Sequence, residues 1–285
     1  MKLSVKILFS IVLGLCLILC GCSFKPDLKS KISNIKPDFK FNFKFNFKHE
    51  KPKDDYTIIL ERGKLIVGVK DDTAPFGFKD EKGNLQGYDI DLAKIIASSI
   101  LGSEDKLEFV PVTTSNRIMK LSSGEVDMLI ATMTITSQRE AILNFSEPYY
   151  MAGQAILVKN SCKYNSLKEF KGKRLIVVFG STSEQNLRTN VPEVDVIGFK
   201  TYNEAFDALK AGKAEGIVAD DTVLMNYALK DKSVKLLPKR YSKEPYAVAF
   251  RRETNSASLK DRTDYIIESL RDSGKLDRMR EKWKL

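Results

Sequence analysis

Three mainly apolar runs along the chain each end in a loop of small, hydroxyl-bearing or charged residues. They are Leu65–Val69 before Lys70, Val126–Ala131 before Thr132, and Arg174–Phe179 before Gly180. The runs have the length of buried strands, and segments with helical spacing of apolar residues, such as Ile90–Ile100, alternate with them. This alternation is typical of α/β folds, in which ligand-contacting groups gather at the carboxyl ends of strands.

The loop after the second run combines three threonines with an arginine. Thr132, Thr134 and Thr136 are followed by Arg139. A guanidinium matches a carboxylate bidentately, and hydroxyl and loop N–H groups can occupy the remaining lone pairs. The alternative is ordinary, because Thr-rich strand ends are common and Arg139 could pair with a glutamate at the surface. The loop therefore predicts a carboxylate site only where other segments supply its context.

The composition indicates a folded protein that does not bind nucleic acid. The chain has 285 residues, 43% of them hydrophobic, enough for one large domain or two lobes with a real core. Residues 1–53 carry eleven lysines against three acidic residues, so they supply +8 of the formal net charge of +10 and leave +2 for residues 54–285. A nearly balanced folded part argues against a nucleic-acid partner.

The first 22 residues have the pattern of a secretory signal peptide. Two lysines precede an apolar run from Ile7 to Cys20, which is shorter than the ~20 residues that span a bilayer as a helix. The end of the run, Leu19–Cys22, resembles a bacterial lipoprotein box, in which a small residue precedes the lipidated cysteine. We therefore predict a lipoprotein signal peptide in residues 1–22 and lipidation of Cys22. The protein would then sit on the outer, extracytoplasmic face of the cell membrane.

Residues 23–55 are predicted to be a flexible tether. They are rich in Lys, Asp, Asn and Pro and show no helical period. Every odd position from Phe39 to Phe47 is a phenylalanine. One interpretation is a low-complexity spacer without a partner. The alternative is an extended segment whose rings rest on the membrane interface, with its lysines near anionic headgroups.

The segment Gly87–Ile100 makes the chain recognisable. It places Asp89 and Asp91 in the first turn of an expected helix, where acidic residues favour the helix dipole. Its order of acidic, apolar and acidic residues, with the small Ala97 further on, resembles the signature of the polar-amino-acid solute-binding proteins of ABC importers. Residues 56–285 are similar to these family 3 extracellular solute-binding proteins, and most so to receptors for acidic amino acids.

The resemblance implies a two-lobed α/β fold of the periplasmic-binding-protein type II class. Two crossover hinge strands would join the lobes, which would close on a ligand by hinge motion. Lobe 1 is predicted in residues 56–151 and 246–285, and lobe 2 in residues 152–245.

The resemblance also assigns the groups that would hold the backbone of a free amino acid. Arg139 would clamp the α-carboxylate, with Thr134 as its hydroxyl partner. Asp220 would accept the α-ammonium. The register is open at this point, because either Asp220 or its neighbour Asp221 could face the cleft.

Further ligand contacts are expected from the second lobe. Ser181 and Thr182 follow a strand and open a helix, where free backbone N–H groups can receive a carboxylate. An ordinary Ser/Thr helix cap is the alternative for both residues. Tyr202 is expected near the same pocket, in the loop before a helix.

The side chain of the ligand would be read by Lys70, Arg117 and Thr132, according to the resemblance. Two cations beyond the one that holds the α-carboxylate favour a second anionic group on the ligand, because a buried charge without a partner is costly. Glutamate or aspartate is therefore the predicted ligand. Lys70 and Arg117 could instead be ordinary solvated surface charges.

The sequence thus predicts a lipid-anchored, monomeric receptor that delivers glutamate or aspartate to an ABC permease, without a cofactor, metal or covalent step. Alternatives are a receptor for another polar amino acid or cystine and, less favoured, a dehydratase-like enzyme on the same scaffold. An enzyme would need a general acid in the cleft, for which Glu184 is the nearest candidate. A sensor module is not expected, because no signalling segment follows in the sequence as given.

Overall fold

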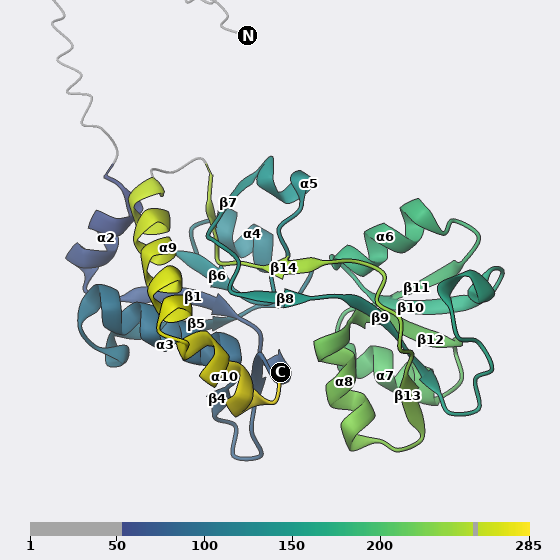
Figure 1. Ribbon diagram of the computed structural model, residues 1–285. Helices are drawn as coiled ribbons and strands as arrows, with labels where there is room; N and C mark the ends of the chain where they lie inside the picture. The colour runs from purple at the N-terminus through teal and green to yellow at the C-terminus, as the bar shows by residue number, and fades with distance from the viewer. Residues whose placement is uncertain (1–52, 253–255) are drawn as a thin grey trace, which may run out of the picture. The chain divides into compact units, whose positions relative to one another are not determined.

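The computed structural model describes residues 53–252 and 256–285, which belong to one compact unit, residues 51–285 (Figure 1). The predicted signal peptide, Cys22 and all but the end of the predicted tether lie outside the described residues. The described part begins with helix α2 (Asp55–Arg62), which Asp54 caps by accepting a hydrogen bond from the Thr57 N–H. The tether is predicted to extend to residue 55, so this helix begins at the last residue of the predicted tether.

The first sheet has five strands in the order β5-β1-β6-β15-β7. Its strands are β1 (Leu65–Val69), β5 (Leu107–Pro111), β6 (Met128–Ile130), β7 (Leu143–Phe145) and β15 (Ala249–Arg251). The strands β5, β1 and β6 are parallel, whereas β15 runs antiparallel to both of its neighbours. The carboxyl ends of β1 and β6 therefore lie at the same edge, which places the loops at Lys70 and Thr132 together.

Helices cover both faces of this sheet. One face packs on α3 (Tyr88–Leu101), α9 (Ala257–Asp272) and α10 (Lys275–Trp283), and the other on α4 (Arg117–Ser122). The helix α3 forms where helical spacing predicted it. Its buried residues Ile96, Ala97 and Ile100 recur at one face, and its left-handed C-terminal residue is Gly102.

The second sheet has the order β11-β10-β12-β9-β13. Its strands are β9 (Gln154–Lys159), β10 (Arg174–Val178), β11 (Asp195–Phe199), β12 (Gly216–Asp220) and β13 (Val234–Leu236). The helices α6 (Thr182–Asn190), α7 (Tyr202–Lys210) and α8 (Asp221–Lys230) follow strands β10, β11 and β12. Each of these helices therefore begins at the edge where the parallel strands β10, β11 and β12 end.

Two antiparallel strands connect the sheets. They are β8 (Tyr150–Ala152) and β14 (Glu244–Tyr246), and Tyr150 pairs with Tyr246. Figure 1 shows both running between the two sheets. We call the part with the first sheet the first lobe and the part with the second sheet the second lobe. The predicted two-lobed α/β fold with two crossover strands is confirmed.

The segment after β1 differs from the predicted polar loop. It forms a small sheet of β2 (Asp72–Thr73), β3 (Gly77–Lys79) and β4 (Leu85–Gln86), and residues 80–84 join the last two strands. A Cβ at Gly77 would lie 2.3 Å from the Lys70 main-chain oxygen. Glycine therefore lets β3 pass close to the end of β1.

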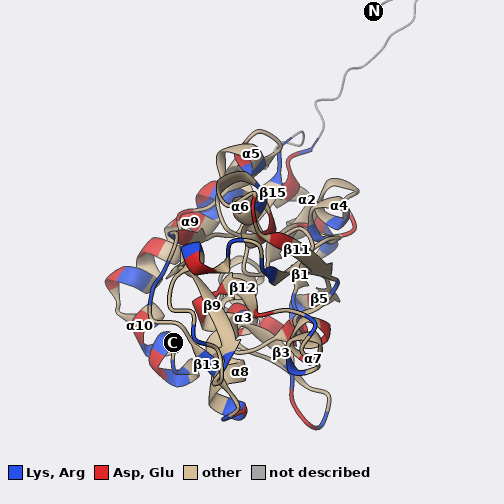
Figure 2. Cartoon of the chain, turned by 90° about the vertical axis from the view of Figure 1, so that its right-hand side faces the viewer, with Lys and Arg blue, Asp and Glu red and all other residues tan. Residues whose placement is uncertain are grey.

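Basic and acidic residues alternate over the helices of the described part, as Figure 2 shows, in keeping with its nearly balanced charge. Within residues 53–252 and 256–285, none of the helices has the length and apolar character needed to cross a membrane. The same residues contain no cluster of three or more potential metal ligands.

Candidate functional site

The predicted site residues converge where the two lobes meet. The ends of β1, β6 and β12 supply Lys70, Thr132 and Asp220, and the loops and helix starts beside them supply the others. Eight of the nine predicted residues are at most 8% exposed, although seven of them are polar or charged and the eighth is a tyrosine: Lys70, Arg117, Thr132, Thr134, Arg139, Thr182, Tyr202 and Asp220. Ser181 is partly buried. Polar groups at this depth need partners, so their contacts indicate what the site can bind.

Arg139 lies in a one-turn helix, α5 (Ser137–Glu140), which the Thr136 hydroxyl caps. Its Nη1 donates to the Thr134 main-chain oxygen at 2.8 Å, and its Nη2 donates to the Gly180 main-chain oxygen of the second lobe at 3.1 Å. The interpretation of Arg139 as a surface partner of a glutamate is therefore wrong. Burial, and next the charge of the nearby Arg117, lower its pKa to about 9. An anion between the lobes would relieve this cost.

Asp220, rather than Asp221, faces the interior between the lobes. The Tyr246 hydroxyl donates to Asp220 Oδ2, and Oδ1 is buried without a hydrogen-bond partner among the described residues. Burial, and next the charge of Glu244, raise the pKa of Asp220 to about 7. Asp221 instead accepts from Arg240 Nε at 2.7 Å. The free buried oxygen of Asp220 can accept a cationic donor.

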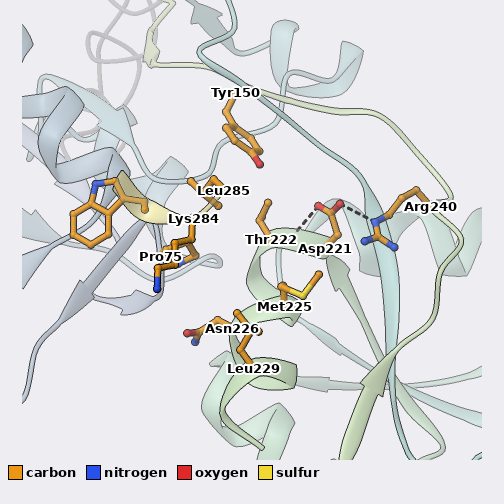
Figure 3. A pocket seen from close by; sticks show the side chains of 11 residues that line it. Pro75, Tyr150, Asp221, Thr222, Met225, Asn226, Leu229, Arg240, Lys284 and Leu285 are labelled. Carbon is orange, nitrogen blue, oxygen red and sulfur yellow. Dashed lines mark hydrogen bonds and ion pairs between the residues drawn. The ribbon is translucent and has the colours of Figure 1, made fainter. Parts of the chain in front are cut away.

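Asp221 lines a groove of about 330 Å³ together with residues of both lobes. Figure 3 shows the Asp221–Arg240 ion pair beside Met225 of α8, with Tyr150 and the C-terminal Leu285 contributed by the first lobe. The two neighbouring aspartates therefore lie in different environments: Asp220 is in the predicted site, and Asp221 is in an ion pair at the groove.

The hydroxyl groups at the start of α6 are already engaged. Ser181 Oγ caps the helix by accepting from the Glu184 N–H at 3.2 Å. Thr182 Oγ1 donates to Glu244 Oε2 at 2.8 Å and accepts from Gln154 Nε2 at 3.1 Å. A ligand carboxylate would therefore meet the first-turn N–H groups of α6 rather than these hydroxyl groups.

Both carboxylate oxygens of Glu184, the candidate general acid, have partners within the second lobe. Its Oε2 accepts from the Gly180 N–H at 3.1 Å, and its Oε1 lies 3.3 Å from Arg188 on the same helix. It thus stabilises the start of α6.

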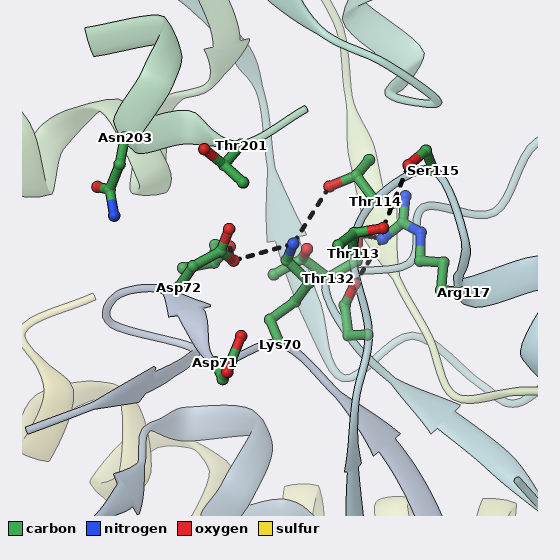
Figure 4. A network of polar contacts seen from close by, with 12 residues as sticks. Lys70, Asp71, Asp72, Thr113, Thr114, Ser115, Arg117, Thr132, Thr201 and Asn203 are labelled. Atoms are coloured by element: carbon green, nitrogen blue, oxygen red, sulfur yellow. Dashed lines mark hydrogen bonds and ion pairs between the residues drawn. The ribbon is translucent and has the colours of Figure 1, made fainter. Parts of the chain in front are cut away.

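Arg117, Thr132 and Lys70 form a polar network, which Figure 4 shows. Arg117 Nη1 donates to the main-chain oxygens of Ala131 at 2.5 Å and Thr132 at 3.1 Å, and its Nε is buried without a partner within the described part. Lys70 Nζ contacts Asp72 Oδ1 at 2.9 Å and Thr114 Oγ1 at 3.4 Å. Burial lowers the pKa of Lys70 and of Arg117. Neither residue is a solvated surface charge.

Tyr202 was expected in a loop but is the first residue of α7. The capping box of Thr201 and Glu204 places the start of this helix at Tyr202 itself. The ring of Tyr202 is buried, and burial raises the pKa of its phenol, while the nearby Arg117 acts in the opposite direction.

Several residues at the site were not predicted from the sequence: Asp72, Asp89, Thr114, Gln154, Glu244 and Tyr246. The pairing of Asp72 with Lys70 could have been predicted from the local sequence. Asp72 follows Lys70 by two residues, and side chains two apart in an extended segment point the same way. The others come from distant segments, and only tertiary structure brings them to the site.

Comparison with known proteins shows which family this chain resembles. Residues 65–285 match the family model of bacterial extracellular solute-binding proteins, family 3. The glutamine-binding protein of Geobacillus stearothermophilus is 46% identical over 200 residues, which cover 70% of this chain and 76% of that protein. The ABC transporter glutamine-binding protein GlnH of Bacillus subtilis (strain 168) is 38% identical over 236 residues, covering 82% and 86%.

A solved structure of an ancestral arginine-binding protein bound to glutamine is also similar. Its TM-score is 0.72 at 41% identity, and the match covers 78% of this chain and 98% of that chain. Both relatives are named for glutamine, so they give the predicted preference for glutamate or aspartate no specific support. They are binding proteins, and the chain is a receptor rather than an enzyme. It belongs to the bacterial extracellular solute-binding proteins, family 3.

Proposed function

We propose that the protein binds one free amino acid between its lobes, and that this amino acid is glutamine. The observation that carries the proposal is the buried pair of opposite charges, Arg139 and Asp220. The Oδ1 atom of Asp220 has no partner among the described residues, and Arg139 reaches across to the second lobe. A zwitterion offers an ammonium for the first group and a carboxylate for the second.

Each end of the zwitterion would have a defined partner. The α-carboxylate would lie between the Arg139 guanidinium and the N-terminal N–H groups of α6, which includes Thr182. The α-ammonium would donate to Asp220 Oδ1, and the Thr134 segment would line the same space. The names of the two relatives support glutamine as the molecule that fills it.

Glutamate or aspartate is the second candidate. Lys70 and Arg117 favour it, because both cations are buried beside the site. Their number alone does not decide the ligand, since a buried cation can already have its counterion inside the protein.

The receptor would deliver its ligand to the permease of an ABC importer. The name of the Bacillus subtilis relative supports this partner. Attachment through a lipidated Cys22 and a position on the outer face of the membrane, which the Leu19–Cys22 pattern supports, complete the proposal together with a monomeric state.

Calorimetric titration of the purified protein with each of the common amino acids and cystine tests the proposed function. Glutamine should bind most tightly, in a one-to-one complex. Binding of glutamate or aspartate with higher affinity would favour the second candidate, and binding of no amino acid would contradict the proposal.

A further inference from the structure

The ammonium group of Lys70 is neutralised within the protein. Lys70 is 1% exposed, and its Nζ lies 2.9 Å from Asp72 Oδ1 and 3.4 Å from the Thr114 hydroxyl. An ammonium carries three N–H donors, so one remains for a further partner. The pair therefore offers a hydrogen-bond donor to the site but no excess positive charge.

Asp72 also keeps an unused acceptor. Its Oδ1 receives Lys70 and the Thr73 hydroxyl at 2.8 Å, whereas Oδ2 has no hydrogen bond to any described residue. Figure 4 shows Asp72 below the start of α7, with Thr201 and Asn203 of the second lobe above it. Its charge also raises the pKa of Tyr202. Asp72 thus stands at the boundary between the lobes, beside the predicted site.

Arg117 does not restore an excess of positive charge. Its Nη1 is held by the main-chain oxygens of Ala131 and Thr132. Its guanidinium interacts electrostatically with two buried carboxyl groups, Asp89 and Asp220. Lys70 therefore has its counterion, Asp72, within the protein, and Arg117 lies close to two buried carboxyl groups.

We propose that Asp72 is a specificity-determining residue, which makes the site select a neutral carboxamide over a carboxylate at the end of the ligand side chain. The inference rests on the proposed function. A carboxamide has one acceptor oxygen and an NH₂ donor, which match the free N–H of Lys70 and the free Oδ2 of Asp72. A carboxylate has acceptors only, so it would leave Asp72 unmatched and place two negative charges together.

The Asp72→Asn variant tests this assignment. The NH₂ group of the new amide can take the place of the free Oδ2 acceptor. Lys70 and the substituted side chain would then present two donors and a net positive charge to the ligand. The ratio of the glutamate Kd to the glutamine Kd should fall by roughly 10- to 100-fold. Far-ultraviolet circular dichroism and the thermal midpoint establish that the variant is folded.

The matched control is Asp71→Asn. Asp71 is adjacent in sequence, and the substitution changes the net charge by the same amount, but its carboxylate pairs with Lys79 at 2.9 Å. In this control, the ratio of the glutamate Kd to the glutamine Kd should stay within about threefold of its value in the unmodified protein. That difference is small compared with the change predicted for Asp72→Asn.

A second test needs no variant and uses the unmodified protein. Protonated glutamate carries an O–H donor and a carbonyl acceptor, like glutamine, and its side chain titrates near pH 4.3. The ratio of the glutamate Kd to the glutamine Kd should therefore fall about tenfold for each pH unit between pH 7 and pH 5. Taking the ratio cancels protein groups that titrate with either ligand.

The charged and titratable groups that act on the Lys70–Asp72 pair are Asp71, Arg117, Tyr202 and Tyr227. Arginine and tyrosine do not change charge between pH 5 and pH 7. The matched control, Asp71→Asn, removes the charge of Asp71.

The outcomes separate this inference from the proposed function. If the unmodified protein binds neither glutamine nor glutamate, the proposed function fails. If it binds glutamine but the folded Asp72→Asn variant and the pH series both leave the ratio unchanged, the role of Asp72 is wrong and the proposed function stands.

Discussion

The main-chain N–H of Thr132 donates to Asp89 Oδ2 at 3.0 Å, although the two residues are 43 positions apart. Thr132 has a φ of 47°, a left-handed conformation that is unfavourable for a β-branched residue. Asp89 Oδ1 also accepts from the Tyr149 hydroxyl at 2.9 Å. One buried carboxyl group therefore holds both a site loop and the residue that precedes the crossover strand β8.

Asp89→Asn should preserve this arrangement better than Asp89→Ala. The amide oxygen can still accept from Thr132, and the amide nitrogen can donate to the Tyr149 hydroxyl. Alanine leaves a buried N–H without a partner, which costs about 1–3 kcal/mol. Urea denaturation should show that loss for the alanine variant and less for the asparagine variant, and calorimetry should show weaker glutamine binding in the same order. Equal losses for both variants would contradict the role of Asp89 as a hydrogen-bond acceptor.

Asp220→Asn should stabilise the ligand-free protein above pH 7 and greatly weaken binding. Burial raises the pKa of Asp220 from 3.8 to about 7. Its ionised form therefore destabilises the folded state by up to about 4 kcal/mol, and the asparagine variant avoids this penalty. The contribution has a definite sign: stability from this group is present below about pH 4 and is lost as the pH rises through about 7.

Denaturation at pH 8 and calorimetry with glutamine measure the two effects of Asp220→Asn. Asp221→Asn is the matched control, because it removes the same charge one residue further along but breaks only the partly exposed pair with Arg240. The control should change stability by less than about 1 kcal/mol. Full glutamine affinity in Asp220→Asn would rule out its role as the ammonium acceptor.

Arg139→Lys should weaken glutamine binding at least about 100-fold, although it keeps the positive charge. The guanidinium contacts Thr134 and Gly180 while leaving further N–H donors for a carboxylate, and lysine cannot reproduce that planar fork. Arg188→Lys on the exposed side of α6 is the control and should leave affinity unchanged. An unaltered dissociation constant for Arg139→Lys would contradict the clamp assignment.

Glu244→Gln should extend glutamine binding to lower pH. The charge of Glu244 contributes to the raised pKa of Asp220, second only to burial. In the unmodified protein, affinity should fall as the pH drops below about 7, because Asp220 becomes protonated and loses its charge for the ammonium. Removing the charge of Glu244 lowers the pKa of Asp220, so the midpoint of this loss should move to a lower pH. A midpoint that stays in place would exclude this coupling.

The sequence predicts the parts of the site that depend on local pattern. Lys70 and Thr132 each follow an apolar strand run, and the ends of parallel strands meet at one edge of the sheet. The start of α6 was likewise visible in the order of Ser181 and Thr182 after an apolar run. Such positions depend on strand periodicity, which a single sequence shows directly.

The charge balance of the site could not be predicted in the same way. Counting Lys70 and Arg117 as free cations favours an acidic ligand. Asp72, the counterion of Lys70, is only two residues away in the sequence, whereas the carboxyl groups near Arg117 come from distant segments. Asp89 reaches Thr132 only through packing of α3 against the first sheet. Hydrogen bonds between distant segments depend on the register of whole elements, and apolar periodicity does not define it.

The crossover strand β14 contacts the parts of the proposed site in both lobes. Its Tyr246 forms an isolated bridge with Thr134 of the first lobe and donates to Asp220 of the second, while Glu244 holds Thr182. If the lobes turn about the crossover strands, groups beside that axis move little, whereas more distant contacts such as Arg139 to Gly180 separate. The ammonium subsite would then stay assembled in the open receptor. An arriving amino acid would be held first by its amine, and closure would be completed around its carboxylate.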